Sequence, residues 1–275
     1  MHLNEQNFRV CILGGGNLGR ALAEGFLESK QVLPENLCIT RRKTHLLADL
    51  AQKGIRVMAD NPAAAQGADL VLLAVKPKIA FEVLAEIRPV LHPGQLLVSV
   101  VTGLSLAQLK EAVPAEVRLF RAMPNTAVSI RESMTCIATQ NAAPEDCALV
   151  LHLFEAVGKA ILIEDELMAA STVLGACGIA FALRYIRAAS QGGIEIGFDA
   201  QTAQLIAAQV VKGAAGLLLE TGHHPEQEID KVTTPQGCTI VGLNEMEHQG
   251  FSSALIKGLK SSHLKIADIA RQVNT

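Results

Sequence analysis

A glycine-rich turn between an apolar strand and a helix is the feature that most constrains the fold. Gly14, Gly16 and Gly19 form the pattern G-x-G-x-x-G, directly after the apolar run 10–13 and directly before the amphipathic segment 18–27. Glycines permit the tight turn and let the backbone approach a pyrophosphate, while the helix N-terminus offers free N–H groups. A glycine-rich turn without a ligand is the alternative, and it leaves the flanking strand and helix unexplained. The sequence therefore predicts a dinucleotide-binding fold.

Short apolar strands alternate with helices in the first part of the chain. We expect strands at 10–13, 37–40, 56–58, 70–75 and 96–101, and helices at 18–28, 44–53, 61–67, 79–90 and 106–113. Such alternation requires mostly parallel strands with helices on both faces. Continuously apolar strands such as 70–75 are typical of a sheet that is covered on both sides. The predicted fold is α/β, with a doubly wound, Rossmann-type N-terminal domain over residues 1–163.

Long helical segments replace this pattern after residue 163, at about 166–192, 199–221, 240–249 and 252–272. They predict an all-α C-terminal domain, residues 164–275, for substrate binding and dimerisation. The first two segments are apolar on more than one face, and a small bundle has little interior in which to bury them. We therefore expect a homodimer, with assembly into a larger homo-oligomer as an open alternative.

Composition argues against two classes of partner. A net charge of −3, one Tyr and no Trp do not fit a nucleic-acid surface, which needs basic and aromatic side chains. The longest uncharged run, 167–183, is shorter than the ~20 apolar residues of a membrane span, and we interpret it as a buried helix. The first residues show no secretory pattern, and the cysteines lack C-x-x-C spacing. We expect a cytoplasmic protein with reduced thiols, and no nucleic acid or membrane as partner.

The end of the second strand distinguishes between nicotinamide cofactors, because an acidic residue there binds the ribose 2′-hydroxyl and a basic one binds a 2′-phosphate. Here the strand ends in Thr40, Arg41 and Arg42, with no Asp or Glu. Because an Arg fork suits phosphate oxygens, we expect NADPH, with NADH as an alternative. The other interpretation of Arg41, Arg42 and Lys43 is a solvated charge run that opens a helix.

Ligands of open α/β sheets bind beyond the carboxyl ends of the strands. Pro77 ends one strand and fixes the turn, which holds Lys76 where a nicotinamide or ribose can lie. The residues that we expect to contact the cofactor are Gly14, Gly16, Asn17, Leu18, Gly19, Thr40, Arg41, Arg42, Asn61, Ala74, Val75, Lys76 and Pro77.

Four strand ends, taken in order, carry a resemblance to a known family. They are the glycine loop, Ala-Val-Lys-Pro at 74–77, Ser-Val-Val-Thr-Gly at 99–103 and Arg-Ala-Met-Pro-Asn-Thr at 121–126. With the stretch 167–219 and the loop segment 232–243, they resemble the pyrroline-5-carboxylate reductase family over nearly the whole chain. The resemblance implies an NADPH-dependent oxidoreductase that reduces the small cyclic imine Δ1-pyrroline-5-carboxylate to L-proline by hydride transfer, as in proline biosynthesis. It also implies a dimer with interlocking helical domains.

The resemblance places the substrate against the loop 234–239, with Thr234, Gly237, Cys238 and Thr239 as contacts and Thr239 as the catalytic residue. Pro235 and Gly237 shape a tight loop, and the helix that follows offers free N–H groups to a carboxylate. The Thr239 hydroxyl would bond the ring nitrogen; its alternative role is a plain helix cap. Cys238 is either a reactive thiol or a spectator.

This sequence departs from the family pattern at two places. The loop P-G-G-T-T or P-G-G-A-T appears as Pro-Gln-Gly-Cys-Thr at 235–239, and the stretch S-G-S-G-P-A-Y appears as Gly-Ala-Cys-Gly-Ile-Ala-Phe at 175–181. Gln236 would narrow the substrate pocket or contact the ligand. The resemblance therefore implies the fold and the cofactor more firmly than it implies the substrate.

Other activities remain open at this stage. A protonated cyclic imine is already an electrophile, so its reduction requires alignment with the hydride donor more than an acid. A hydroxyacid dehydrogenase of similar build would ordinarily need a Lys on the helix 166–192, which offers Arg184 and Arg187 instead. Another imine reductase and a non-catalytic NADPH sensor are further alternatives. His223 and His224 lack further ligands at metal-binding spacing, so we interpret them as a surface turn and expect no metal.

Overall fold

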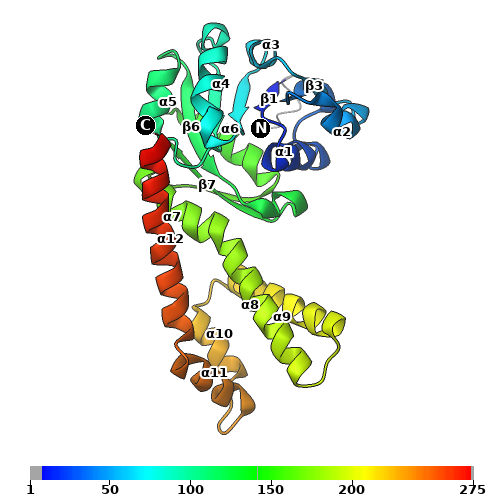
Figure 1. Cartoon of the computed structure of the whole chain (residues 1–275), viewed down its shortest axis with the longest axis vertical. Helices are drawn as coiled ribbons and strands as arrows, with labels where there is room; N and C mark the ends of the chain where they lie inside the picture. The colour runs from blue at the N-terminus through cyan, green and yellow to red at the C-terminus, as the bar shows by residue number, and fades with distance from the viewer. Residues whose placement is uncertain (1–7, 141, 274–275) are drawn as a thin grey trace. The chain divides into compact units, whose positions relative to one another are not determined.

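The structure is a computed structural model that describes residues 8–140 and 142–273 (Figure 1). By its internal contacts the chain divides into two compact units. Unit 1 comprises Met1–Cys177 with Ser262–Thr275, and unit 2 comprises Gly178–Ser261.

Unit 1 is built on one sheet of eight strands in the order β3-β2-β1-β4-β5-β6-β7-β8. Strands β1 to β6 are parallel, β7 pairs antiparallel with β6, and β8 pairs parallel with β7. The order reverses on either side of β1, so the turn after β1 lies at the switch point where such sheets bind ligands. The doubly wound fold is confirmed. The strands are β1 Val10–Leu13, β2 Leu37–Thr40, β3 Arg56–Met58, β4 Leu70–Leu73, β5 Leu96–Ser99, β6 Arg118–Met123, β7 Ser133–Thr139 and β8 Gly158–Leu162.

Short helices and 3-10 turns connect these strands. Asp60 caps α3 by accepting a hydrogen bond from the Ala63 N–H, and Ser105 forms a capping box with Gln108 at α5. The segments 44–53 and 79–90, each expected as one helix, are part 3-10 and part α; Pro89 has no N–H to continue α4 beyond Ile87. The helices are α1 Asn17–Glu28, α2 Ala48–Gln52, α3 Asn61–Gln66, α4 Ala80–Ile87, α5 Leu106–Ala112 and α6 Pro144–Glu155, and the 3-10 turns are Pro34–Asn36, Thr44–Leu47, Pro77–Ile79, Arg88–Val90 and Thr126–Ile130.

Alternate residues of the strands enter two separate cores, one on each face of the sheet. On one face, Ile12 and Ile39 pack with Phe26 of α1 and Phe154 of α6. On the other face, the neighbouring strand residues pack with α3, α4 and α5. All four residues of β1, β2, β4 and β5 are buried, because helices cover both faces.

The helical part begins inside unit 1. The 3-10 turn Asp165–Leu167, helix α7 Met168–Ser171 and the π-helical segment Thr172–Cys177 follow β8. Met168 is buried in a small core with Met123 and Ala138, which are residues of the sheet. For this reason the division by contacts falls after Cys177, whereas the sequence places the domain boundary between residues 163 and 164.

Unit 2 is helical, as the fold prediction requires. Its elements are α8 Gly178–Glu195, α9 Ala200–Thr221, α10 Pro225–Val232, α11 Cys238–His248 and the first part of α12 Phe251–Val273. Asp199 caps α9 by accepting from the N–H groups of Gln201 and Thr202, and Gly222 ends it with a left-handed backbone. Within the unit α8 and α9 pack together, and a Cβ on Gly193 would come within 3.0 Å of the Ala203 Cβ.

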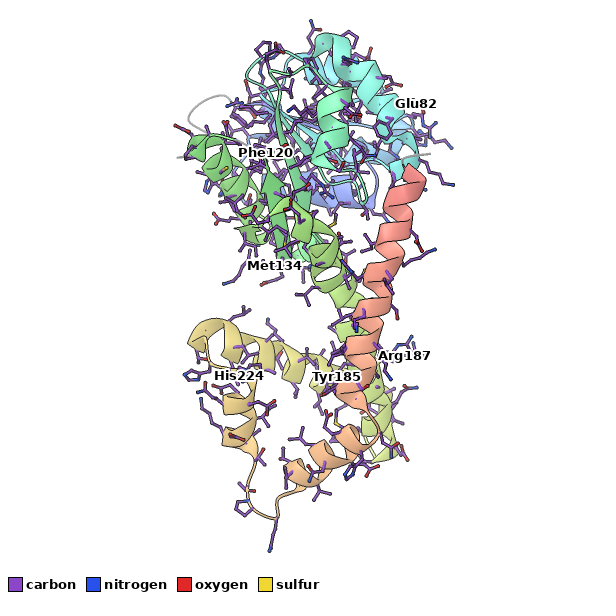
Figure 2. The ribbon with its side chains drawn as sticks, turned by 90° about the vertical axis from the view of Figure 1, so that its left-hand side faces the viewer. Glu82, Phe120, Met134, Tyr185, Arg187 and His224 are labelled. Atoms are coloured by element: carbon purple, nitrogen blue, oxygen red, sulfur yellow. The ribbon has the colours of Figure 1, made fainter. Side chains whose placement is uncertain are left out.

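Unit 2 leaves large apolar side chains exposed. No residue of α8 is buried, and only Ala203 and Ala207 of α9 are. Leu205 is 69% exposed and Val210 58%. Figure 2 labels Tyr185 and Arg187 on α8, and the Tyr185 ring contacts the Phe251 ring with centroids 6.3 Å apart. These helices therefore present apolar faces that the single chain does not cover.

The uncharged run 167–183, expected to be a buried helix, is only partly buried in the single chain. Leu174, for example, is 72% exposed. By length and composition alone, Asp165–Glu195 and Ala200–Thr221 would each be able to cross a membrane, and two such helices are weak evidence of a span. The expectation of burial therefore holds only for the first part of the run: Met168, Thr172 and Val173 are buried, whereas every residue of 174–183 is half-buried or exposed in the single chain.

Candidate functional site

The turn after β1 carries the first part of the candidate site. Gly14 has a φ of +111°, which favours glycine. Helix α1 begins at Asn17, and its N-cap, Gly16, makes no side-chain hydrogen bond. The first N–H groups of α1, including those of Asn17 and Leu18, therefore have no capping side chain and can bind an anion.

The three glycines of the motif have different reasons to lack a side chain. A Cβ on Gly14 would lie 2.5 Å from the Ala74 carbonyl oxygen, and one on Gly19 would lie 2.1 Å from the Gly14 oxygen. A Cβ on Gly16 would meet nothing within 4 Å. Gly14 and Gly19 thus permit close packing of the protein itself, whereas the space beside Gly16 is open, as a bound pyrophosphate requires. This turn fits a dinucleotide.

Thr40, at the end of β2, holds the turn in place. Its hydroxyl accepts a hydrogen bond from the Gly14 N–H at 3.2 Å and donates one to Asn61 Oδ1 at 2.7 Å. The Asn61 amide donates in turn to Glu86 Oε2 at 2.8 Å. Thr40 is buried, so its hydroxyl acts on the turn more than on a ligand.

The two arginines after Thr40 are placed differently. Arg41 donates from its guanidinium to the Gly15 carbonyl at 2.8 Å, and the Gly15 N–H donates to the Thr40 carbonyl at 2.6 Å. Arg42 is exposed and makes no hydrogen bond or ion pair with the part of the chain that is described. Arg41 therefore supports the glycine turn, and Arg42 is the guanidinium left available for a phosphate.

The segment 74–77 lies against the same turn. The Ala74 N–H donates to the Leu13 carbonyl at 2.8 Å, and Val75 Cγ1 would lie 2.9 Å from a Cβ on Gly14. Pro77 begins a 3-10 turn, and Lys76, just before it, is exposed. The structure thus connects Thr40, Arg41, Asn61, Ala74 and Val75 to the glycine turn, through direct contacts or through Thr40. Their role in cofactor binding stays a prediction.

The predicted substrate loop lies in unit 2. The Gly237 N–H donates to the Thr234 carbonyl at 2.9 Å, and Gln236 has a φ of +58°. Pro235 followed by a residue with positive φ is typical of a type II turn. A Cβ on Gly237 would lie 2.4 Å from Thr234 Oγ1, so a larger residue here would force the Thr234 side chain to move.

Thr239 is the second residue of α11, and Gly237 is the N-cap of that helix. Thr239 is therefore no helix cap, which removes the alternative role considered for it. The Thr239 hydroxyl makes no hydrogen bond to any of the described residues, 8–140 and 142–273. The Cys238 thiol beside it is free and exposed. The start of α11 thus presents a free hydroxyl and uncapped N–H groups.

The two histidines before Pro225 are part of a helix start that the sequence pattern did not reveal. His224 caps α10 by accepting from the Glu226 N–H, and forms a capping box with Gln227. His223 Nδ1 lies 2.6 Å from Glu228 Oε1, and Lys231 together with His223 lowers the pKa of that carboxyl. No group of three metal-type side chains occurs among the residues described.

Two buried polar residues, Arg121 within β6 and Asn125 just beyond its carboxyl end, were not singled out from the sequence, although the segment 121–126 was. Arg121 forms an ion pair with Asp165. Asn125 caps the following 3-10 turn through the Ala127 N–H and donates to the Gly175 carbonyl at 3.1 Å. Both residues connect β6 to the helical segment that follows β8.

Known proteins with similar sequences agree on one family. The pyrroline-5-carboxylate reductase dimerisation family matches residues 165–269, and the family described as NADP oxidoreductase coenzyme F420-dependent matches residues 9–103. Pyrroline-5-carboxylate reductase 1 of Dictyostelium discoideum is 43% identical over 96% of this chain and 50% of its own length. Pyrroline-5-carboxylate reductase 2 of the same organism is 38% identical over 94% of this chain and 92% of its own. The crystal structure of Plasmodium falciparum pyrroline carboxylate reductase with NADP bound is 26% identical, with a TM-score of 0.86 over 96% of this chain and 99% of that chain.

Proposed function

Because the chain belongs to the pyrroline-5-carboxylate reductase family, we propose that it is the NADPH-dependent enzyme that reduces Δ1-pyrroline-5-carboxylate to L-proline. The proposal that the chain binds NADPH rests on the open space beside Gly16, the middle glycine of a motif whose other two glycines are closely packed. The proposal that the chain binds the imine substrate rests on the uncapped start of α11 and on the free Thr239 hydroxyl.

The residues of unit 1 bind and orient the cofactor. The N–H groups at the start of α1 hold the pyrophosphate, and Thr40 with Arg41 keeps the turn in position. Arg42 pairs with the 2′-phosphate, which a guanidinium binds through charge-assisted hydrogen bonds. When bound, NADPH supplies the hydride.

The start of α11 binds the substrate. Its N–H groups, with the positive end of the helix dipole, hold the substrate carboxylate. The Thr239 hydroxyl oxygen accepts a hydrogen bond from the protonated ring nitrogen and so orients the imine carbon. A protonated imine needs no further proton before reduction, which is why orientation is the main task of these side chains.

The active form is a homodimer joined through the helices of unit 2. Leu205 and Val210 of α9 are exposed in the single chain, and the segment that contains them matches a dimerisation family. An apolar surface of this kind marks an interaction site. A larger assembly and a cytoplasmic location remain predictions from the sequence.

A direct assay tests this function. The purified chain should oxidise NADPH when Δ1-pyrroline-5-carboxylate is added and should form proline in equal amount. NADH measured in parallel tests the cofactor preference. NADPH binding without oxidation by any cyclic imine would contradict the proposal and favour a sensor, and oxidation by an α-keto acid alone would favour a hydroxyacid dehydrogenase.

A further inference from the structure

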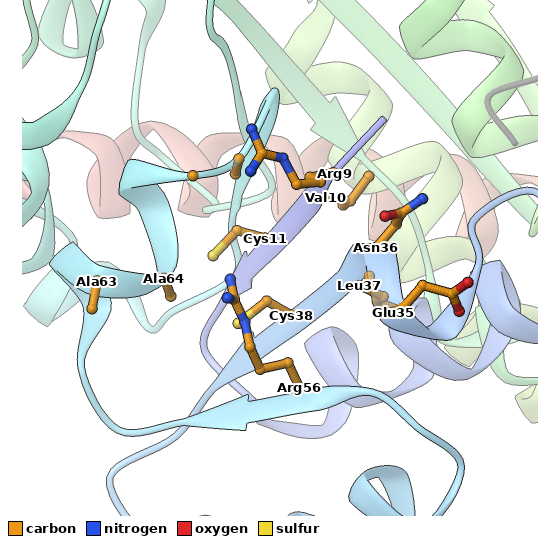
Figure 3. Close-up of a pocket in the computed structure, with 12 residues that line it drawn as sticks. Arg9, Val10, Cys11, Glu35, Asn36, Leu37, Cys38, Arg56, Ala63 and Ala64 are labelled. Carbon is orange, nitrogen blue, oxygen red and sulfur yellow. The ribbon is translucent and has the colours of Figure 1, made fainter. Parts of the chain in front are cut away.

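Two cysteines and an arginine form a row across three neighbouring strands. Cys11 of β1 is paired in register with Cys38 of β2, and Cys38 with Arg56 of β3. Residues paired in this way point to the same face of a sheet, and Figure 3 shows both sulfur atoms on one side with the Arg56 side chain reaching toward them. Neighbouring strands lie about 4.8 Å apart, within the roughly 4.4–6.8 Å that the Cα atoms of a disulfide span.

A cavity borders this row; Cys11 is fully buried and Cys38 is 3% exposed, so Cys38 is the residue of the pair that solvent touches. The volume of the cavity is about 100 Å³, and Cys11, Cys38 and Arg56 are among the residues that line it. One water needs roughly 10–15 Å³ of such space, so hydrogen peroxide, which is little larger than water, has room. The lining also includes Arg9 and Asn36, at the opening ends of β1 and β2. The cavity is therefore at the opposite end of these strands from the glycine turn.

The environment activates one of the two thiols. A hydrogen bond from Cys11, followed by one from Arg56, lowers the pKa of Cys38 to about 7. The same bond to Cys38, together with burial, raises the pKa of Cys11. The thiolate is the nucleophile in thiol chemistry, and thiols with a pKa near the ambient pH attack fastest. At neutral pH Cys38 is thus the attacking sulfur, with the Cys11 thiol beside it.

We propose that Cys11 and Cys38 are a redox-active dithiol that hydrogen peroxide oxidises to a disulfide. The Cys38 thiolate attacks one peroxide oxygen, the O–O bond breaks, and Cys38 sulfenic acid and hydroxide form. The Cys11 sulfur then attacks the Cys38 sulfur, loses its proton, and displaces hydroxide. Two thiols lose two electrons to one peroxide molecule, and the products are one disulfide and two waters. An external dithiol then reduces the disulfide to the two thiols and is itself oxidised to a disulfide.

Peptide mapping of the full-length protein tests this directly. Cleavage after Arg9, Arg20, Lys30 and Arg41 releases peptides 10–20 and 31–41, each with one cysteine. After treatment of the reduced protein with one equivalent of hydrogen peroxide and alkylation in denaturant, we expect these peptides to be joined, and dithiothreitol to separate them. Both peptides fully alkylated, with oxidation confined to the exposed Cys238, would overturn the proposal.

Variants and a second reagent complete the test. Cys38→Ser should abolish the linkage and leave Cys11 alkylatable, whereas Cys147→Ser, which removes a half-buried thiol on α6, should leave the linkage unchanged. Should Cys38→Ser not fold, wild-type protein still decides the matter through phenylarsine oxide, which binds paired thiols. We expect it to protect both peptides from alkylation at pH 7. No protection at either cysteine would contradict the pairing.

Discussion

The Thr40 hydroxyl accepts a hydrogen bond from the backbone N–H of Gly14, and so joins the end of β2 to the turn that follows β1. The same hydroxyl donates to Asn61, at the start of α3. The shape of the glycine turn thus depends on a side chain that is far from it in sequence and that is itself shielded from solvent.

Thr40→Val should weaken the binding of NADPH and NADH by similar factors. The variant keeps the shape of the side chain but leaves the Gly14 N–H and Asn61 without their partner, at a cost of about 1–3 kcal/mol. Titration of both cofactors against the purified variant measures the effect, with Thr40→Ser as the control that retains the hydroxyl. Wild-type affinity for both cofactors in the Val variant would show that the bond is dispensable.

Gly16→Ala should lower cofactor affinity and should lower the melting temperature only slightly, since alanine is a poorer N-cap than glycine. The added methyl group meets no protein atom within 4 Å, so it occupies only the space reserved for the ligand. Gly19→Ala is the contrasting variant, because its methyl group would collide with the Gly14 carbonyl and destabilise the fold. Thermal unfolding and cofactor titration separate the two effects. Unchanged NADPH affinity in Gly16→Ala would contradict the assignment of the turn.

Arg42→Ala should reduce affinity for NADPH and leave NADH almost unchanged. The loss should correspond to about 1.5–3 kcal/mol, the contribution of a hydrogen bond to a charged group. Arg41→Ala is the informative control, since Arg41 also holds the Gly15 carbonyl and its removal should weaken both cofactors. If Arg42→Ala weakened both equally, Arg42 would not recognise the 2′-phosphate.

Thr239→Val should lower kcat/KM for the imine about 10-fold or more, because one hydrogen bond to a charged nitrogen is lost. The affinity for NADPH should remain at the wild-type value. Thr239→Ser keeps the hydroxyl and should retain most of the activity. Steady-state kinetics with saturating NADPH provide the measurement, and a Val variant as active as wild type would contradict the substrate contact of Thr239.

Leu205→Asp should separate the dimer and abolish activity together. A carboxylate at the centre of an apolar interface is left unpaired and desolvated, which is costly. Sedimentation measures the assembly, and the interface of the wild type should exceed about 2,000 Å² in total, as obligate interfaces do. Ala115→Asp, on an exposed turn of unit 1, introduces the same charge and should change neither property. A wild-type protein that stays monomeric and active at the lowest measurable concentration would contradict the dimer.

The sequence predicts the first five strands, and β1, β2, β4 and β5 are evident because each is a short, mainly apolar run that follows a polar or charged residue. The predicted strands 70–75 and 96–101 extend two residues too far, since β4 ends at Leu73 and β5 at Ser99. The antiparallel entry of β7 could not be predicted, since Ser133–Thr139 follows β6 through a 3-10 turn without the glycine signal of a tight hairpin. Helix α10 was missed for another reason. Its segment Pro225–Val232 is mostly polar, so it has little apolar periodicity, and its cap is a histidine in place of the usual Ser, Thr, Asp or Asn.

The candidate site shows the same division. The glycine motif is visible in the sequence because local geometry dictates its residue types. The direction of the Arg41 side chain cannot be predicted from the sequence. Whether its guanidinium reaches a phosphate or the Gly15 carbonyl depends on the position of β2 relative to the turn. Likewise Cys11 and Cys38 are far apart in the chain, and only the strand register makes them neighbours.

Gln236 occupies a left-handed backbone conformation in the turn before α11. For a residue other than glycine or asparagine this conformation raises the energy of the ordered turn by roughly 1 kcal/mol. A difference of 1 kcal/mol increases the population of other conformations of the turn about fivefold. The segment that carries the proposed substrate contacts is therefore less rigid than it would be with glycine at position 236, so the departure in this loop bears on how firmly substrate and product are held.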